Sequence, residues 1–228
     1  MTNINYDFIE EYIRDNIIYK DEKLLEMRNY AEKFHVPIVE PETEEFIKFL
    51  ISSTKPKNIL ELGTAIGYSS ISFAKFSKNI ELIDTVEIKE EMAQIATKNI
   101  EQENLNDIIH VYIDDAYEYL LNCSKKYDLI FIDAAKGQYE KYFNKAINNL
   151  SDCGIIICDN VLFKGMVANE DLVKRRKKTI VKRLRTFLKD IKREENLVTS
   201  IVPIGDGVLL VRRKDEKDWI ISSSWRFK

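Results

Sequence analysis

Two apolar runs, each ending in acid, constrain the fold of this chain more than any other feature. The first covers residues 129–133 (LIFID), and the second covers residues 155–160 (IIICDN). Both are continuous and rich in β-branched residues, a pattern typical of strands buried on both faces of a parallel sheet. The amphipathic segment 138–150 separates them. The pattern therefore predicts strand, helix and strand, joined by a right-handed crossover.

The polar residues that end the two runs predict a site. Parallel strands end at the same edge of a sheet, and neighbouring strands lie about 4.8 Å apart, so Asp133, Asp159 and Asn160 are expected to meet there. Ligands of open α/β sheets bind at this edge. Two carboxylates and an amide suit Mg²⁺, and could also hold Mn²⁺ or Ca²⁺. The alternative is structural: a helix cap at Asp133 and an Asx turn at Asp159.

The remaining strand patterns predict the fold class. Strands are expected at 58–62, 81–86 and 108–113, each followed by a helical pattern, and a Gly-Asp-Gly turn joins two further strands at 196–203 and 207–213. We expect an α/β, Rossmann-like, doubly wound sheet of seven strands, mostly parallel, that ends in an antiparallel hairpin. Amphipathic helices in residues 5–53 would cover the sheet or form a subunit interface. Two prolines predict an extended connection at 35–41.

Length and composition set the domain organisation. The 228 residues suit one domain, residues 1–213 with N-terminal helices over about 1–55, followed by a polar tail, 214–228, that carries Trp219 and Trp225 and has no assigned role. The three cysteines lie in or beside apolar runs, which favours buried thiols in a reducing cytoplasm. No apolar run approaches the roughly 20 residues that span a bilayer, so no membrane partner is expected.

A glycine turn and two acids predict a nucleotide-containing cofactor. The strand at 58–62 runs into Gly63 and Gly67 before a helix, so backbone N–H groups could contact a ligand there. An ordinary βα turn explains this GxxxG pattern equally well. Glu87 ends the next strand, about 20 residues further on, where an acid can bind ribose hydroxyls; the alternative is a first-turn acid of the following helix. Asp115 ends the third strand and could accept from an adenine amino group or cap a helix.

These motifs resemble a known family. Residues 60–69 (LELGTAIGYS) resemble motif I of class I S-adenosylmethionine-dependent methyltransferases, and residues 131–136 and 159–162 resemble the metal motifs of the metal-dependent O-methyltransferases of the catechol and caffeoyl-CoA type. Segments 30–38, 131–139 and 159–165 are similar to bacterial methyltransferases that act on 5-hydroxyuridine in tRNA. The resemblance covers roughly residues 5–213.

The resemblance implies a role for each matched residue. The metal ligands would be Asp133, Asp159 and Asn160, and Lys136 would lie near the substrate hydroxyl as a catalytic residue with Asp133. Lys136 could accept the proton when neutral or stabilise the oxyanion when charged. The resemblance also implies a homodimer. The implied contacts to S-adenosylmethionine are Val39, Gly63, Ser69, Glu87, Asp115, Ala116 and Asp133.

A basic stretch bears on the substrate. Residues 174–185 contain eight basic residues and no acid, in a chain whose net charge is −3. A small catechol needs no such field, whereas a phosphate backbone does; a solvated helix face is the alternative. Together with the resemblance, which implies 5-hydroxyuridine at wobble position 34 in the tRNA anticodon loop, this stretch leads us to predict Mg²⁺-dependent methylation of that nucleoside, giving 5-methoxyuridine. The first rival is methylation of a small catechol or phenol; the second is a non-enzymatic binding module. The candidate RNA contacts are Lys174, Arg175, Arg176, Lys177, Lys178, Lys182 and Arg183.

Overall fold

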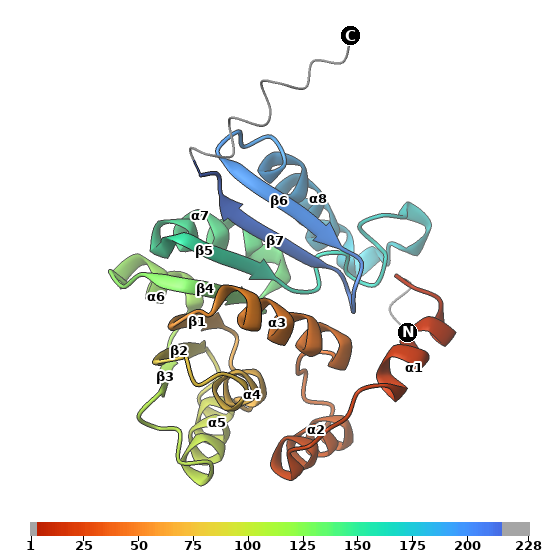
Figure 1. The fold of residues 1–228 in the computed structure, drawn as a ribbon. Coiled ribbons are helices and arrows are strands. Elements are labelled where there is room, and N and C mark those ends of the chain that lie inside the picture. The colour runs from red at the N-terminus through yellow and green to blue at the C-terminus, as the bar shows by residue number, and fades with distance from the viewer. Residues whose placement is uncertain (1–3, 216–228) are drawn as a thin grey trace.

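The structure, a computed structural model, describes residues 4–215, which build one seven-stranded sheet (Figure 1). The strand order is β3-β2-β1-β4-β5-β7-β6, with β1 to β5 parallel and β7 antiparallel to both β5 and β6. The predicted doubly wound sheet with an antiparallel C-terminal hairpin is therefore confirmed. The strands are β1 Asn58–Leu62, β2 Leu82–Glu87, β3 Ile109–Ile113, β4 Tyr127–Ile132, β5 Leu150–Cys158, β6 Leu197–Val202 and β7 Val208–Arg213.

Helices cover both faces of the sheet and bury two apolar cores. On one face α6, α7 and α8 pack over β4, β5 and β7; on the other α2 to α5 pack over β1 to β3 (Figure 1). Within the described residues, no helix is long and apolar enough to cross a membrane. The helices are α1 Asp7–Asp15, α2 Glu22–Phe34, α3 Pro41–Thr54, α4 Tyr68–Phe76, α5 Glu90–Gln102, α6 Ala116–Asn122, α7 Tyr139–Asn149 and α8 Lys178–Ile191, with short 3₁₀ turns η1 Lys136–Gln138, η2 Glu170–Leu172 and η3 Arg175–Lys177.

One local expectation differs from the structure. Pro41 is the first residue of α3 rather than part of an extended connection, because proline lacks only a donor that is unsatisfied at a helix start anyway. The basic stretch spans two elements: Arg175–Lys177 form η3, and α8 begins at Lys178, inside the stretch.

The strand order creates a crevice between β1 and β4. The chain builds β2 and β3 on one side of β1 and β4 and β5 on the other, so the connections diverge at this point. Such switch points open a crevice at the carboxyl ends of the strands. The register pairs Leu62 with Ile132 and Ile132 with Cys158. Gly63, Asp133 and Asp159 therefore leave three adjacent strands side by side.

Candidate active site

A cavity of about 640 Å³ occupies this crevice. Its walls are the carboxyl ends of β1, β2, β3 and β4, and residues 36–40 close it from the N-terminal side. Lys136, Asn160 and Asp206 lie at the same cavity. It is also lined by every residue predicted to contact the cofactor: Val39, Gly63, Ser69, Glu87, Asp115, Ala116 and Asp133.

The glycine turn is shaped by a close backbone approach. Gly63 has a φ of 106°, and a Cβ added there would lie 2.1 Å from the carbonyl oxygen of Asp133. Gly67 has a φ of 80° and begins α4 as its N-cap. Both conformations favour glycine. Gly63 thus lets β1 pass directly against the end of β4, which keeps the cofactor turn beside the acidic residues.

Two predicted acids also hold the backbone around the cavity. Glu87 is 9% exposed, and its two oxygens accept from the amides of Ala65 and Lys89, each at 2.9 Å. Each carboxylate oxygen has a second lone pair, so ribose hydroxyls can still bind. Asp115 caps α6 by accepting from the amide of Tyr117 at 2.8 Å. The capping alternative therefore holds for Asp115, although the residue also lines the cavity.

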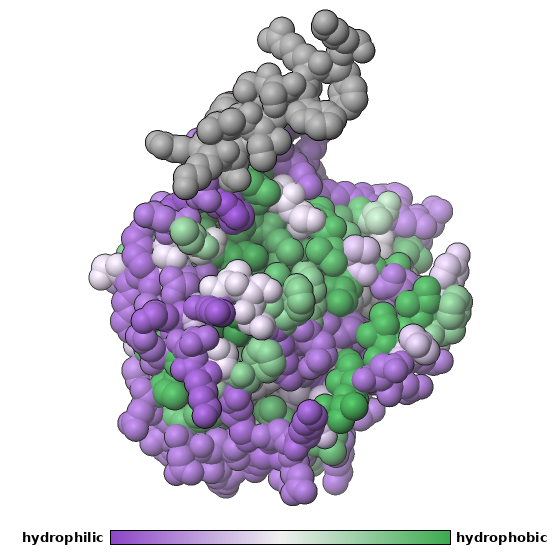
Figure 2. Space-filling model, viewed as in Figure 1, coloured by the Kyte–Doolittle hydropathy of each residue, from purple (hydrophilic) through white to green (hydrophobic). Residues whose placement is uncertain are grey.

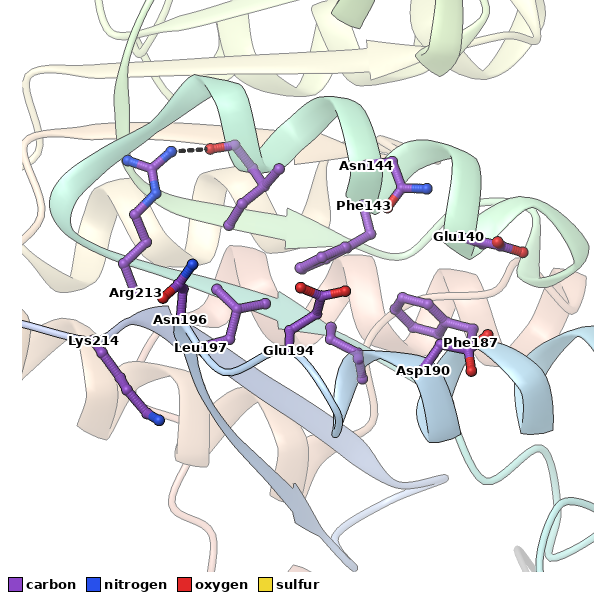
Figure 3. A pocket seen from close by; sticks show the side chains of 12 residues that line it. Glu140, Phe143, Asn144, Phe187, Asp190, Glu194, Asn196, Leu197, Arg213 and Lys214 are labelled. Atoms are coloured by element: carbon purple, nitrogen blue, oxygen red, sulfur yellow. Dashed lines mark hydrogen bonds between the residues drawn. The ribbon is translucent and has the colours of Figure 1, made fainter. Parts of the chain in front are cut away.

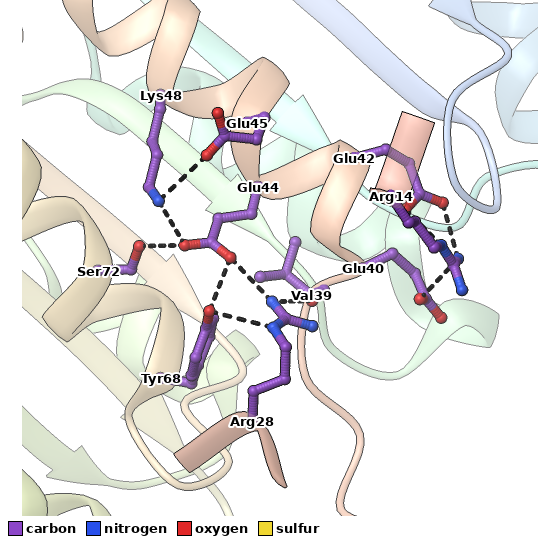
Figure 4. A network of polar contacts seen from close by, with 10 residues as sticks. All are labelled: Arg14, Arg28, Val39, Glu40, Glu42, Glu44, Glu45, Lys48, Tyr68 and Ser72. Carbon is purple, nitrogen blue, oxygen red and sulfur yellow. Dashed lines mark hydrogen bonds and ion pairs between the residues drawn. The ribbon is translucent and has the colours of Figure 1, made fainter. Parts of the chain in front are cut away.

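A buried ion-pair network positions the N-terminal wall of the cavity (Figure 4). Glu44 is 1% exposed and accepts from Arg28 at 2.8 Å and from the Tyr68 hydroxyl at 2.7 Å. The same guanidinium nitrogen of Arg28 donates to the carbonyl oxygen of Val39 at 3.1 Å. The sequence analysis did not identify this network, because its members lie in α2, α3 and α4 without a shared motif. It ties α2 to the segment that covers the cavity.

Ser69 turns its hydroxyl to a second buried acid. Ser69 and Ser70 both donate to Glu61, which is fully buried in β1, and Thr85 donates to it at 2.6 Å. Burial raises the pKa of Glu61 to about 7, while the three hydroxyls oppose that shift. Glu61 therefore fixes the first turn of α4 beneath the cavity.

We expect Glu61→Gln to flatten the pH dependence of stability. The pKa of Glu61 rises from 4.5 to about 7 on folding, so the folded chain binds the proton more tightly. The free energy of unfolding therefore falls as pH rises through this window, by up to about 3 kcal/mol. Gln keeps an oxygen acceptor without the charge. The Tm of the variant minus that of the wild type should increase between pH 5 and 8, whereas Glu101→Gln, at an exposed position, should show no such trend. A pH-independent difference would contradict this pKa.

Asp133 and Asp159 form an acidic pair in which Asp159 is buried and Asp133 is partly buried. Asp159 is 1% exposed, its Oδ1 accepts from the Asn160 amide at 2.6 Å, and its Oδ2 is buried without a hydrogen-bond partner. Burial raises the pKa of Asp159 well above its usual range, and the neighbouring Asp133 raises it further. Burial also raises the pKa of Asp133, against the charge of Lys136. Buried charges of this kind are normally paired or coordinate metals.

The residues fit a hard divalent cation. Among the described residues there is no group of three or more His, Cys, Asp or Glu side chains that could hold a metal; the predicted set is two carboxylates and an amide. A cation would provide a partner for the unsatisfied Oδ2 of Asp159 and offset the repulsion of the acidic pair. Asn160 adopts a left-handed conformation, with a φ of 55°, and lines the cavity. Oxygen donors of this kind suit Mg²⁺, Mn²⁺ or Ca²⁺.

Lys136 supplies positive charge to this acidic group. It begins η1, lines the cavity, and its charge lowers the pKa of Asp133, Asp159 and Asp206 against the effect of burial. Its Nζ lies 5.9 Å from the centre of the Phe163 ring, a distance compatible with a cation–π contact. The predicted catalytic lysine therefore lies beside the predicted metal ligands.

The C-terminal hairpin anchors the loop after Asp159. Asp206 is 7% exposed; its side chain accepts from the Lys164 amide, and its carbonyl oxygen accepts from the Leu162 amide at 3.0 Å. The carbonyl oxygen of Gly207 accepts from the Val161 amide at 2.9 Å. Sequence analysis identified only a turn here; the acid between two glycines was the available signal. The loop needs anchoring because it holds four left-handed residues, Asn160, Phe163, Lys164 and Gly165.

The basic stretch lies beside the segment that carries Lys136. All seven candidate RNA contacts are exposed. Arg183 donates to the carbonyl oxygen of Gly137 at 3.1 Å, and the Nζ of Lys177 lies 5.6 Å from the centre of the same Phe163 ring that Lys136 contacts. This positive surface therefore extends to Lys136, the predicted catalytic lysine.

Comparison with known proteins gives a consistent family. The family model described as O-methyltransferase matches residues 14–214. The chain is 34% identical over 178 residues to a catechol O-methyltransferase from Niastella koreensis, covering 75% of this chain and 80% of the relative. It is 28% identical over 221 residues to caffeoyl-CoA O-methyltransferase 2 from Petunia hybrida, covering 91% and 90%.

Solved structures agree. A candidate caffeoyl-CoA O-methyltransferase from Staphylococcus aureus is 34% identical, with a TM-score of 0.85, and the match covers 91% of this chain and all of that one. The Bacillus cereus O-methyltransferase in complex with SAH (S-adenosylhomocysteine) is 29% identical, with a TM-score of 0.79 over 94% of this chain and all of that one. The closeness to tRNA enzymes stays a prediction. The chain belongs to the S-adenosylmethionine-dependent O-methyltransferase family of the catechol and caffeoyl-CoA type.

Proposed function

We propose that this protein transfers the methyl group of S-adenosylmethionine to a hydroxyl of a small catechol or phenolic acceptor, free or carried as a coenzyme A thioester. The observation that carries the proposal is the acidic pair formed by Asp133, which lines the cavity, and the fully buried Asp159, which has an unsatisfied oxygen. An acceptor with two neighbouring oxygens, such as a catechol, suits a site of this kind. The catechol and caffeoyl-CoA relatives support the same acceptor class.

The residues divide the cavity into two halves. Glu87 would accept from the ribose hydroxyls and Asp115 with Ala116 would face the adenine, while Gly63, Ser69 and Val39 would line the methionine part. Asp133, Asp159 and Asn160 would hold Mg²⁺, or Mn²⁺ or Ca²⁺ in its place. When bound, the cation would lower the pKa of the acceptor hydroxyl. Asp206 and Gly207 hold the loop that orients Asn160.

Lys136 is proposed to stabilise the acceptor oxyanion through its charge, because it faces three carboxylates. Lys136→Arg keeps the charge but cannot accept a proton at neutral pH, so it should retain much more kcat than Lys136→Ala. We expect the Ala variant to lose about 10²-fold. Steady-state kinetics with a catechol acceptor measures both. Equal loss in the two variants would instead assign proton transfer to Lys136.

A second candidate acceptor is 5-hydroxyuridine at wobble position 34 of tRNA. The exposed basic stretch beside Lys136 favours it, because phosphate groups bind such surfaces. The phosphates of a coenzyme A thioester would use the same charges. Both acceptors present two adjacent oxygens, so the methyl-transfer chemistry would be the same.

Methyl transfer from labelled S-adenosylmethionine distinguishes the acceptors. The purified chain would be incubated with a catechol, with a catechol-bearing coenzyme A thioester, and with unmodified or 5-hydroxyuridine-containing tRNA. We expect the highest kcat/KM with a catechol or its thioester. Efficient and exclusive methylation of the hydroxylated tRNA would assign the second candidate, and no transfer to any hydroxyl would contradict the proposal.

Replacing Arg175, Arg176 and Lys177 by Ala should separate charged from neutral acceptors. Their removal should raise KM for the thioester or the tRNA and flatten its salt dependence, without changing KM for a free catechol. The matched control replaces the exposed Lys55, Lys78 and Lys98, which do not line the cavity. Equal KM values in both variants would mean that the basic stretch is a solvated surface with no role in acceptor binding.

We also propose a cytoplasmic homodimer. Cys123, Cys153 and Cys158 are free thiols, which suits a reducing compartment, although of the three only Cys158 is buried as predicted and Cys153 is exposed. Apolar side chains gather over β7 and along α1 (Figure 2), and exposed large residues there include Phe8 at 67% and Tyr12 at 71%. Exposed apolar surface of this kind supports a subunit interface. Light scattering would test the oligomeric state.

A further inference from the structure

A groove separate from the active-site cavity runs between α7 and α8 (Figure 3). Its volume is about 660 Å³. The floor is apolar and is formed by Phe143, Ile147, Phe187, Ile191 and Leu197. Figure 3 shows the carboxylates of Glu140, Asp190 and Glu194 along the same groove. It therefore suits an occupant with large apolar side chains and positive charge.

The chain itself leads into this groove. Arg213 and Lys214, at the end of β7, line it, and Arg213 donates to the carbonyl oxygen of Ile147 at 2.6 Å. The described residues end at Asp215, and 13 residues follow, to Lys228. Trp219 lies five residues beyond Lys214, within about 17 Å of it even when fully extended. The groove extends along α7 from Ile147 to Glu140, seven residues and about 10 Å of helix.

The sequence of that following segment matches the groove. Residues 216–228 (EKDWIISSSWRFK) contain five large apolar residues, and the last ten residues hold two basic and no acidic side chains. Large apolar residues suit the floor, and Arg226 and Lys228 suit the acidic rim. The part of the segment that follows Glu216 and Asp218 is therefore complementary in charge to the rim, and the attachment point makes the segment's effective concentration at the groove high.

We propose that the groove between α7 and α8 binds residues 216–228 of the same chain, with tryptophan side chains on its apolar floor. The binding removes apolar surface from water on both partners. It also gives the C-terminal tail a role, covering the outer face of the helix that follows Lys136. The proposal is independent of the acceptor of the methyl group.

Tryptophan fluorescence tests this directly, because Trp219 and Trp225 are the only tryptophans of the chain. In the folded full chain we expect emission shifted to the blue and protected from acrylamide. Reversing the exposed rim acids with Glu140→Lys, Asp190→Lys and Glu194→Lys should shift emission to the red and raise quenching towards that of a free tryptophan amide. The control reverses the exposed Glu91, Glu101 and Glu118, and its emission should match the wild type.

Three outcomes would overturn the proposal. Wild-type emission equal to that of the urea-unfolded chain would show no docking. Equal emission in the rim variant and the control would place the tryptophans elsewhere. A blue shift lost on dilution would show that a second copy supplies the segment. Retention on dilution, together with loss in a variant that replaces Leu197 by Lys on the floor, would support docking within one chain.

Discussion

Asp159→Asn is expected to reduce methyl transfer by about 10²- to 10³-fold without lowering the Tm. The carboxylate is fully buried, faces Asp133 and keeps one oxygen without a partner, so its negative charge serves a ligand rather than the fold. Loss of several kcal/mol of stabilisation at the reacting oxygen corresponds to the stated factor. Removing one of two buried like charges should leave stability unchanged or increase it.

Steady-state kinetics, calorimetry and a control variant test the prediction for Asp159→Asn. S-adenosylmethionine binding by the Asp159→Asn variant should remain close to that of the wild type, because Asp159 is not among the residues that line the cavity. Asp107→Asn, at an exposed position before β3, makes the same chemical change away from the site and should leave kcat unchanged. Full activity of the wild type in excess chelator, or full activity of the Asp159→Asn variant, would contradict the metal assignment.

Gly63→Ala should be strongly disruptive, because its added Cβ makes the shortest contact found at any glycine in the described residues. The added Cβ would lie 2.1 Å from the Asp133 carbonyl oxygen and 2.8 Å from its carbon, at a φ of 106°. Neither backbone segment can move away without a cost in free energy, because β1 and β4 are hydrogen-bonded neighbours. We expect a loss of roughly 3 kcal/mol or more from strain and overpacking together.

Gly137→Ala is the matched control for this effect. Its nearest atoms would lie 3.7 Å from the new Cβ, in ordinary contact, although the residue is only four positions from Asp133. Urea unfolding should show a large drop in midpoint for Gly63→Ala and almost none for Gly137→Ala. A small drop for Gly63→Ala, with cofactor binding preserved, would mean that β1 and β4 can separate at this point.

Sequence patterns predicted the sheet and the acidic site because both depend on local rules. Continuous apolar runs define buried parallel strands, and residues that end neighbouring strands must share an edge. Asp133 and Asp159 therefore follow from their positions alone. The same rule brought Glu87 and Asp115 to the cavity, and the structure adds that their oxygens also hold backbone amides.

Contacts between distant segments were not predictable in this way. The ion pair of Arg28 with Glu44 joins α2 and α3, and no sequence pattern relates the two positions. Asp206 accepts a hydrogen bond from Lys164, which lies 42 residues earlier in the chain. Glu61 occupies a strand position that periodicity assigns to the core; only the three hydroxyls from α4 and β2 explain a buried acid there. The partners of such polar groups come together only in the folded structure, so a single sequence does not reveal them.

The hairpin that anchors the loop after Asp159 has a consequence for biosynthesis. β7 is the last of the strands that the structure describes, yet it lies inside the sheet between β5 and β6, and the turn before it supplies Asp206 and Gly207 to that loop. While the ribosome has delivered only β1 to β5, the edge of β5 is unpaired and the loop has no anchor. Such exposed edges invite aggregation during slow, non-local folding. Synthesis of β6 and β7 is therefore the step that both pairs this edge and anchors the loop.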